Sequence, residues 1–374
     1  MTLTDEQRAV RDVVREYARE EIRPTAREAD ETQTFPEAVW DGLAELDLTG
    51  LTVPAKYGGY DAEPVTASIV NEAVAYGSLS VATALSVHSL ATSCIATFGS
   101  EAQQERWLPE MAEGRPVGAF ALSEPHAGSN PAAMTTEARR EGDEYVINGD
   151  KQWITNGDRS GVVILFAKTD RSDPNTVTQF LVPKDVDGLT VGEKEDKLGL
   201  RASDTTSLTF DDVRIPVENR LTEEGRGLSA AFEILTGGRV AIASQAVGLA
   251  DHALEEAIEY SQEREQFDGP IADIQSVRHK IAEMATRTEA ARQLTRHAAR
   301  RRAAGDGAMV ASMAKYLASE AAMDVTNESV QVHGGYGYVS EFEVERLYRD
   351  AKITEIYEGT TEIQKTVIAR HLLD

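Results

Sequence analysis

Cysteine is almost absent from this chain of 374 residues. Cys94 is the only thiol, and one thiol can form neither an internal disulfide nor the ligand set of an iron–sulfur cluster. A secreted fold that depends on internal disulfides is therefore excluded. The first six residues also lack the basic region and the apolar run of a secretory signal. We therefore expect a protein of the reducing cytoplasm.

Basic residues are scarce as well. The chain has 38 lysine and arginine residues, only 10 of them lysine, against 63 aspartate and glutamate residues, so its net charge is −25. This excess repels the phosphates of nucleic acids, and a nucleic-acid partner is not expected. It also destabilises the compact state by self-repulsion unless salt screens it, which indicates a halophilic protein from a salt-rich cytosol.

Residues 79–100 carry no formal charge, but they do not have the composition of a membrane span. The segment carries eight serine and threonine residues and His88, and such groups are costly in hydrocarbon. We expect a buried helix that lines a polar or ligand-containing interior, and no membrane span. The seven histidines show no paired metal-ligand spacing, so no metal site is expected.

Helical periodicity is present at both ends of the chain, and short β-branched runs lie between them. Helices are predicted at residues 4–22, 37–46, 64–76, 79–98, 101–113, 228–262, 271–304, 308–332, 341–351 and 362–373, and strands at 145–150, 153–155, 161–168, 176–182, 189–191 and 207–215. No helix separates the strands, which argues against a crossover α/β fold.

We therefore expect an α+β protein of three parts. An N-terminal helical domain would cover residues 1–116, and a C-terminal four-helix bundle would cover residues 226–374. Between them, residues 117–225 would form a middle β-barrel or sandwich domain of roughly five to seven strands.

Four motifs carry the functional signal. They are Phe120-Ala-Leu-Ser-Glu-Pro-His-Ala-Gly-Ser-Asn130, Lys151-Gln-Trp-Ile-Thr-Asn-Gly157, Gln331-Val-His-Gly-Gly-Tyr-Gly337 and Ile356-Tyr-Glu-Gly-Thr-Thr-Glu-Ile-Gln364. With these motifs in this order, the chain resembles the acyl-CoA dehydrogenase family along essentially its whole length, and most closely the short-chain, butyryl-CoA-type branch. The resemblance implies an FAD cofactor, an acyl-CoA substrate, a homotetramer and an electron-transferring flavoprotein as partner.

The first two motifs suit a flavin. Small and hydroxyl-bearing residues at 122–129 let backbone N–H groups approach a carbonyl-rich ligand, although most such strings are ordinary turns. An aromatic ring at Trp153 beside Thr155 can serve as a platform, although a core tryptophan is the commoner case. The resemblance implies flavin contacts from Phe120, Leu122, Ser123, Gly128, Ser129, Trp153, Ile154 and Thr155, with Ser129 also meeting the substrate. Ser123 replaces the family's usual threonine, and Asn130 its usual aspartate.

A second set of cofactor contacts is implied near the C-terminus. An arginine at a helix end, such as Arg264, can pair with a pyrophosphate, although solvation is its commoner fate. Thr361 and Gln364 have capping-box spacing, and the helix start that they predict favours phosphate oxygens. The resemblance implies that Arg264, Gln275, Gln331, Gly334 and Gly335 reach the FAD of a neighbouring subunit, and that Thr360 and Glu362 also bind FAD. No Gly-x-Gly-x-x-Gly motif follows a strand, so a Rossmann fold is not expected.

The last motif supplies a candidate base. Removing an α-proton from a thioester needs a carboxylate whose pKa a desolvated pocket raises from about 4.3 toward neutrality. One glutamate among 63 acidic residues is by default a surface charge, but the resemblance assigns this role to Glu358. Some relatives take their base from the position before an arginine, where this chain has Gly238 before Arg239. The implied substrate contacts are Thr236, Gly237, Gly238, Arg239 and Gly359.

The implied reaction is FAD-dependent oxidation of an acyl-CoA to the trans-2-enoyl-CoA, with proton transfer to Glu358 and hydride transfer to flavin N5. A short or short branched acyl chain is favoured. An acyl-CoA oxidase, a decarboxylating glutaryl-CoA-type dehydrogenase and a non-catalytic flavin-binding relative stay open as alternatives. The glutaryl type needs a cation in the acyl pocket, where residues 79–98 offer only His88. The basic run Arg296–Arg302 has no assigned role.

Overall fold

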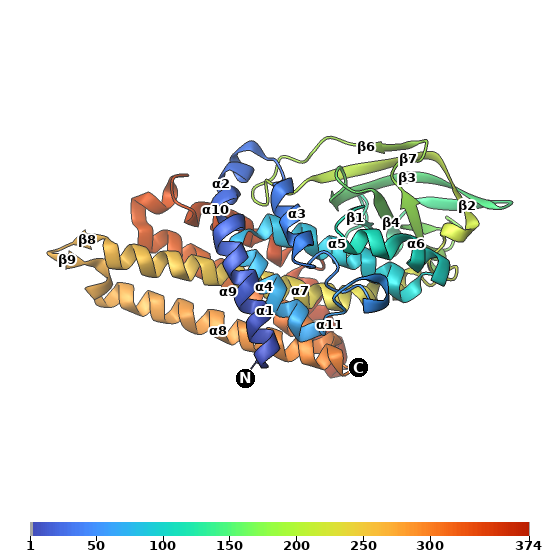
Figure 1. Ribbon diagram of the computed structural model, residues 1–374. Coiled ribbons are helices and arrows are strands. Elements are labelled where there is room, and N and C mark those ends of the chain that lie inside the picture. Colours follow the sequence, from blue (N-terminus) through green and yellow to red (C-terminus); the bar gives the residue numbers. More distant parts are fainter. Residues whose placement is uncertain (1–2, 374) are drawn as a thin grey trace.

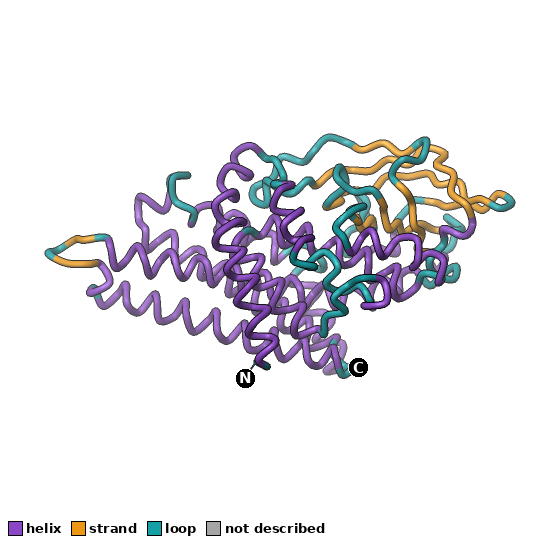
Figure 2. Tube along the Cα trace, in the orientation of Figure 1, coloured by secondary structure: helices purple, strands orange, loops and turns teal. Residues whose placement is uncertain are grey.

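Helices form both ends of the chain and one sheet lies between them, as the computed structural model shows for residues 3–373 (Figure 1; Figure 2). The N-terminal helices are α1 (Asp5–Tyr17), α2 (Arg23–Thr32), α3 (Glu37–Glu45), α4 (Pro64–Gly77), α5 (Leu79–Phe98) and α6 (Glu101–Ala112). The C-terminal helices are α7 (Gly227–Glu263), α8 (Gln275–Ala303), α9 (Ala308–His333), α10 (Val344–Ala351) and α11 (Thr361–Leu373). The predicted α–β–α order is confirmed.

The first helical segment continues beyond the predicted end at residue 22. A capping box of Thr4 and Gln7 is present at its start. A π-helical turn, Ala18–Ile22, then joins α1 to α2, and Pro24 lies in the first turn of α2. A proline is tolerated there because the first N–H groups of a helix have no partner within it.

The middle part is a single seven-stranded sheet with the order β1-β4-β2-β3-β7-β6, and β5 pairs with β4. Its strands are β1 (Gly118–Ala121), β2 (Glu137–Glu141), β3 (Glu144–Thr155), β4 (Val162–Lys168), β5 (Val177–Pro183), β6 (Leu189–Val191) and β7 (Thr205–Pro216). The predicted strands at 145–150 and 153–155 are one strand, β3. Strands β1 and β2 were not predicted.

The helices from the two ends of the chain share one hydrophobic core. Val70 of α4, Ala246 of α7 and Ala318 of α9 belong to the same buried cluster. One face of the sheet packs on helices, because Ile164 and Phe166 share a cluster with Ile95 of α5, while Leu165 and Phe180 on the other face belong to a core of the sheet itself. The candidate site lies where these helices meet the sheet.

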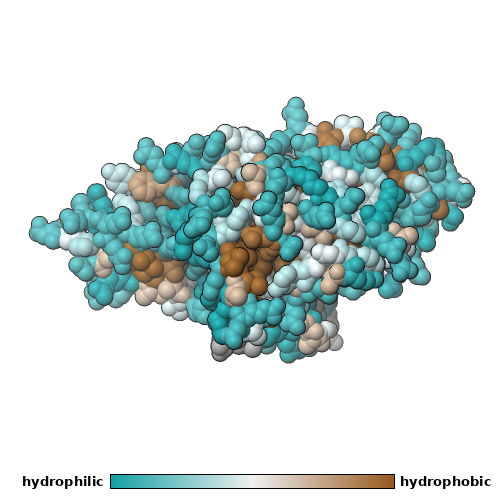
Figure 3. Space-filling model, viewed as in Figure 1, coloured by the Kyte–Doolittle hydropathy of each residue, from teal (hydrophilic) through white to brown (hydrophobic). Residues whose placement is uncertain are grey.

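Helix α5 is the one described helix that is long and apolar enough to cross a membrane, and 83% of its apolar window is buried inside the protein. This burial agrees with the predicted core helix. The face of the molecule in Figure 3 is mostly hydrophilic, with a few separate hydrophobic patches.

Candidate active site

Glu358 lies in the short connection before α11, and its side chain meets helix α7. Its backbone is left-handed, with φ of 50°, and Gly359 follows with φ of 96°. A non-glycine residue in this region is strained, and such strain is concentrated at functional sites. A Cβ atom on Gly238 would lie 2.1 Å from Oε2 of Glu358, so glycine at position 238 makes room for this carboxylate.

The carboxylate of Glu358 is placed for proton transfer near neutral pH. Its Oε2 atom is buried and has no hydrogen-bond partner among the described residues. Burial raises the pKa of Glu358 to about 7, while the positive charges of Lys315 and Arg239 act to lower it. A general base whose pKa lies near the working pH is an effective one.

Three side chains, none of which the sequence indicated for this role, hold the loop around Glu358 in place. Nζ of Lys315 donates a hydrogen bond to the carbonyl oxygen of Gly359 at 2.7 Å, and Nε2 of Gln364 donates to the same oxygen at 2.8 Å. The hydroxyl of Tyr357 donates to Oε1 of Gln245 at 3.3 Å, which ties the loop to α7. Burial lowers the pKa of Lys315 to about 8.

The start of α11 differs from the predicted capping box. Thr360, not Thr361, caps the helix, because its hydroxyl accepts a hydrogen bond from the N–H of Ile363 at 3.4 Å. The side chain of Gln364 instead donates a hydrogen bond to the carbonyl oxygen of Gly359. Glu362 is exposed in the first turn of α11.

The predicted flavin loop is fixed to the sheet by a buried ion pair. Nζ of Lys151 lies 2.8 Å from Oε1 of Glu124 and donates to the carbonyl of Leu122 at 3.2 Å. The N–H of Gln152 donates to the carbonyl of Ser123 at 3.0 Å. Burial opposes ionisation of Glu124, but the ammonium of Lys151 and further hydrogen bonds lower the pKa of Glu124 to about 2. Loop residues 122–124 are thereby held at the edge of strand β3.

Trp153 presents an open aromatic surface beside this loop. A β-bulge between Lys151 and Ile154 gives Trp153 a left-handed backbone with φ of 63° and leaves its side chain 60% exposed. Ile154 is buried in the sheet core, so only its backbone is open to a ligand. Phe120 packs on Phe166 with ring centroids 4.8 Å apart. Gly128 and Ser129 are exposed, and Thr155 is half-buried.

The residues predicted to reach the FAD of a neighbouring subunit lie at the other end of the molecule, whereas Thr360 and Glu362 lie at the start of α11 near Glu358. Arg264 and Gly335 line a surface pocket of about 540 Å³ near the hairpin of β8 (Glu265–Gln266) and β9 (Gly269–Pro270). Gln275 and Gln331 are exposed. Figure 1 shows this hairpin at the end of the helical bundle opposite the sheet.

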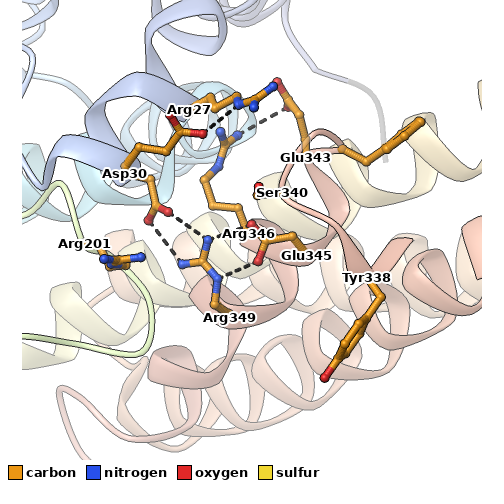
Figure 4. A pocket seen from close by; sticks show the side chains of 11 residues that line it. Arg27, Asp30, Arg201, Tyr338, Ser340, Glu343, Glu345, Arg346 and Arg349 are labelled. Carbon is orange, nitrogen blue, oxygen red and sulfur yellow. Dashed lines mark hydrogen bonds and ion pairs between the residues drawn. The ribbon is translucent and has the colours of Figure 1, made fainter. Parts of the chain in front are cut away.

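Another pocket, of about 500 Å³, contains none of the predicted site residues (Figure 4). Most of its charged side chains pair with one another, whereas Arg201 forms no ion pair and its Nε atom has no hydrogen-bond partner among the described residues. Nη2 of Arg349 lies 2.8 Å from Oδ2 of Asp30, and Nε of the same arginine lies 2.7 Å from Oε2 of Glu345. Arg346 contacts Glu343 at 3.3 Å. This pairing makes the pocket a structural ion network.

One group of metal-type ligands converges in the structure, namely His252, Glu256 and Glu343. Arg23 forms ion pairs with both carboxylates, and Arg346 forms one with Glu343. These guanidinium groups already supply the positive charge that a cation would bring, so we assign the group as an ion-pair network.

The whole chain matches one family. Residues 4–115, 119–213 and 225–373 match the acyl-CoA dehydrogenase N-terminal, middle and C-terminal domains, respectively. The chain belongs to the acyl-CoA dehydrogenase family. It is 43% identical to an acyl-CoA dehydrogenase of Bacillus subtilis, with 100% of this chain and 99% of the relative covered.

Two further relatives point to the short-chain branch. The mitochondrial short-chain specific acyl-CoA dehydrogenase of Rattus norvegicus is 43% identical, with 99% of this chain and 91% of the relative covered. The solved structure of butyryl-CoA dehydrogenase from Megasphaera elsdenii is 40% identical and superposes with a TM-score of 0.97, with 100% of both chains covered. The predicted fold is confirmed by this match.

FAD is the cofactor of acyl-CoA dehydrogenases, and the residues of this enzyme fit it. An exposed indole beside a loop with the exposed residues Gly128 and Ser129 is a surface that suits an isoalloxazine ring. The exposed Arg264 at the far end has the guanidinium geometry that pairs with a pyrophosphate. The individual contacts stay predictions.

Proposed function

We propose that this enzyme oxidises a short-chain acyl-CoA between Cα and Cβ to the trans-2-enoyl-CoA, with Glu358 as the base. The observation that carries the proposal is the state of this carboxylate. The carboxylate packs against Gly238, and its Oε2 atom has no hydrogen-bond partner among the described residues. Burial raises the pKa of Glu358 to about 7. A structural ion pair would leave no such free, desolvated oxygen.

Different residues of the chain have different roles in the reaction. Glu358 takes the α-proton of the thioester, and its backbone N–H is the proposed donor to the thioester oxygen, where negative charge develops. Thr236–Arg239 and Gly359 line the substrate, and Ser129 meets both substrate and cofactor. Bound FAD supplies the hydride acceptor for the β-hydrogen. Trp153 and the loop 120–129 orient it.

A homo-oligomer follows from the separation of the two cofactor sets. The platform at Trp153 and the pocket at Arg264 lie at opposite ends of the chain (Figure 1). A neighbouring subunit that presents its Arg264 end would complete each site. We propose a tetramer built as a dimer of dimers, with an electron-transferring flavoprotein as the acceptor of the electrons.

The structure disfavours a glutaryl-type acyl pocket. His88, the one candidate cation on α5, accepts a hydrogen bond from the N–H of Gly118 at 3.0 Å and contacts the carbonyl of Met111 at 3.0 Å. Burial lowers the pKa of His88 to about 4, so the ring is neutral at physiological pH. A neutral structural histidine cannot pair with an acyl carboxylate.

The test is anaerobic reduction of the purified protein. We expect a yellow preparation that butyryl-CoA bleaches, and an activity that falls as the acyl chain lengthens. Glu358→Gln should keep the colour and lose the bleaching. Bleaching of that variant at an unchanged rate would mean that another group is the base.

An oxygen electrode separates a dehydrogenase from an oxidase, since only an oxidase consumes oxygen at the catalytic rate.

A further inference from the structure

Asn156 joins three elements of the candidate site by hydrogen bonds from one side chain. It comes directly after Trp153 and Thr155 at the end of strand β3, and its side chain is fully buried. Its Nδ2 atom donates to the carbonyl oxygen of Ala84 in α5 at 3.0 Å and to the carbonyl oxygen of Gly118 in β1 at 3.2 Å. One amide therefore ties the end of β3 to both α5 and β1.

Gly118, the first residue of β1, is held through both of its backbone polar groups. Among the described strands β1 pairs only with β4, so backbone groups that face away from β4 need other partners. The N–H of Gly118 donates to Nδ1 of His88 in α5 at 3.0 Å, and its carbonyl accepts from Asn156. A Cβ atom at position 118 would lie 2.5 Å from Cβ of Ala91, so the glycine lets β1 lie directly on α5 (Figure 1). Two buried side chains thus fix β1 against α5.

The backbone of Asn156 does not by itself account for the amide. Its φ is 62°, and asparagine adopts this left-handed region more readily than most residues. Glycine would adopt it equally well, and it would not bury a polar side chain. The Oδ1 atom of Asn156 is buried without a hydrogen-bond partner among the described residues, which is unfavourable. The two hydrogen bonds of Nδ2 are therefore the feature that needs a reason.

Helix α5 packs against the surroundings of the proposed base. Cδ2 of Leu90 lies 3.5 Å from a Cβ atom built on Gly238, the glycine that makes room for the carboxylate of Glu358. The hydroxyl groups of Thr83 and Tyr357 are 3.5 Å apart, and Tyr357 directly precedes Glu358. A shift of α5 would therefore move the wall next to the base.

We propose that Asn156 is a positioning residue for hydride transfer, because its amide fixes the spacing between the flavin side and the base side of the site. The proposal rests on the proposed function above. The flavin side consists of Trp153 on β3 and the loop 120–129 that begins in β1. The base side consists of Glu358 and the helix α5 that packs beside it. Asn156 is hydrogen-bonded to elements on both sides.

The spacing matters because the proposed reaction breaks two C–H bonds together. Glu358 takes the hydrogen on Cα as a proton, and the electrons of that bond form the new double bond. The hydrogen on Cβ leaves with its electron pair to bound FAD, which is thereby reduced by two electrons. Both transfers need Cα beside the carboxylate while Cβ lies beside the flavin, and a displacement of about 1 Å can cost about 100-fold in rate.

The experiment is stopped-flow reduction of the holoenzyme by butyryl-CoA under anaerobic conditions. Asn156→Gly keeps the left-handed backbone and removes only the amide. We expect its rate of flavin reduction at saturating butyryl-CoA to fall about 10- to 100-fold, with KM and FAD retention near the wild-type values. Asn156→Asp keeps the shape of the side chain but cannot donate to both carbonyls, so it should be impaired as well.

Two further readouts separate positioning from a general loss of order. Deuterium on Cβ of butyryl-CoA should slow Asn156→Gly more than the wild-type enzyme, because hydride transfer becomes more rate-limiting. The pH at which reduction rises should not move, since the amide carries no charge. Asn148→Gly is the matched control, because Asn148 lies on the same strand and its Nδ2 atom binds only Asp212 of β7, at 2.9 Å. This control should reduce at the wild-type rate.

Several outcomes overturn the proposal. An unchanged rate of reduction in Asn156→Gly overturns it, and so does an equal fall in Asn148→Gly. A raised KM or lost FAD at an unchanged rate also overturns it, since the amide would then support binding alone. Should Asn156→Gly not fold, as judged by lost flavin colour, Asn156→Asp and His88→Leu carry the same comparison, because His88→Leu releases the N–H of Gly118. Loss of the fold in all three overturns the proposal, because these contacts would then serve folding alone.

The two proposals fail separately. If butyryl-CoA does not bleach the wild-type enzyme, the proposed function fails, whatever the variants do. If the wild-type enzyme is bleached and Asn156→Gly is bleached at the same rate, only the positioning role of Asn156 fails.

Discussion

Lys315 and Glu358 act on each other across helix α9 and the loop before α11. The ammonium of Lys315 donates a hydrogen bond to the carbonyl of Gly359 at 2.7 Å, so it holds the backbone next to the base. The same positive charge acts to lower the pKa of Glu358, which burial raises to about 7. Lys315 is thus placed to position the proposed base and to influence the pH at which Glu358 is ionised.

Lys315→Met should shift the pH profile of flavin reduction. The base works in its ionised form, so kcat/KM rises as pH increases through the pKa of Glu358. Removing the nearby positive charge raises that pKa, and the rising limb should move to higher pH by about one unit or more. The measurement is kcat/KM for anaerobic reduction from pH 5.5 to 9. Lys365→Met is the control, because Lys365 is an exposed residue of α11 with a distant ion pair to Glu320 at 3.8 Å. An unshifted limb in Lys315→Met would contradict the electrostatic role.

Glu358→Gln should stabilise the fold above neutral pH. The folded-state pKa of Glu358 is about 7 and its ordinary value is 4.5, so between these pH values the folded protein binds more protons than the unfolded chain. Stability therefore falls as pH rises through this window, by about 3 kcal/mol in total. Glutamine cannot ionise and avoids this loss.

Thermal melts of the wild-type and Glu358→Gln proteins at matched pH measure the effect. The Tm difference should be near zero at pH 4.5, grow toward pH 7 and stay constant above pH 8. Comparison at equal pH cancels the contribution of other buried acids such as Asp350. A Tm difference that is the same at every pH would show that the substitution acts through packing instead of charge.

Some features of the fold and of this site could be predicted from the sequence and others could not, for physical reasons. Helix α5 could be predicted from its long run without charged residues, and the C-terminal helices from their long amphipathic stretches, while the motif around Glu358 supplied the proposed base. Strand β2, Glu137–Glu141, was missed because its residues are mostly charged, and its pairing with β3 makes it a strand. Lys315 lies 44 residues from Gly359, so no local pattern links them. Trp153 is exposed only because a bulge turns its backbone.

The buried pair of Lys151 and Glu124 should support both stability and flavin binding. Lys151→Met leaves the carboxylate of Glu124 buried without its cation, which costs about 3 to 5 kcal/mol. It also removes the hydrogen bond to Leu122, so the flavin loop loses an anchor. We expect a lower Tm and a weaker retention of FAD on dialysis. In the double variant Lys151→Met/Glu124→Gln, which has no buried charge at this place, much of the Tm should return while FAD retention stays reduced. If the double variant is no more stable than the single one, the loss comes from packing and not from the unpaired carboxylate.

The net charge of −25 predicts that this enzyme needs salt. At low ionic strength the excess acidic residues repel one another through the solvent, and this repulsion favours the expanded state. At 1 M salt the screening length is about 3 Å, so most of that repulsion is removed. We therefore expect the Tm to rise steadily from 0.05 M to 2 M KCl. The buried pair of Glu124 and Lys151 is screened little, so the variant at Lys151 should keep its deficit in Tm at every salt concentration. A wild-type Tm that does not fall on dilution from molar salt would show that specific ion pairs, and not general repulsion, dominate the charge energetics of the fold.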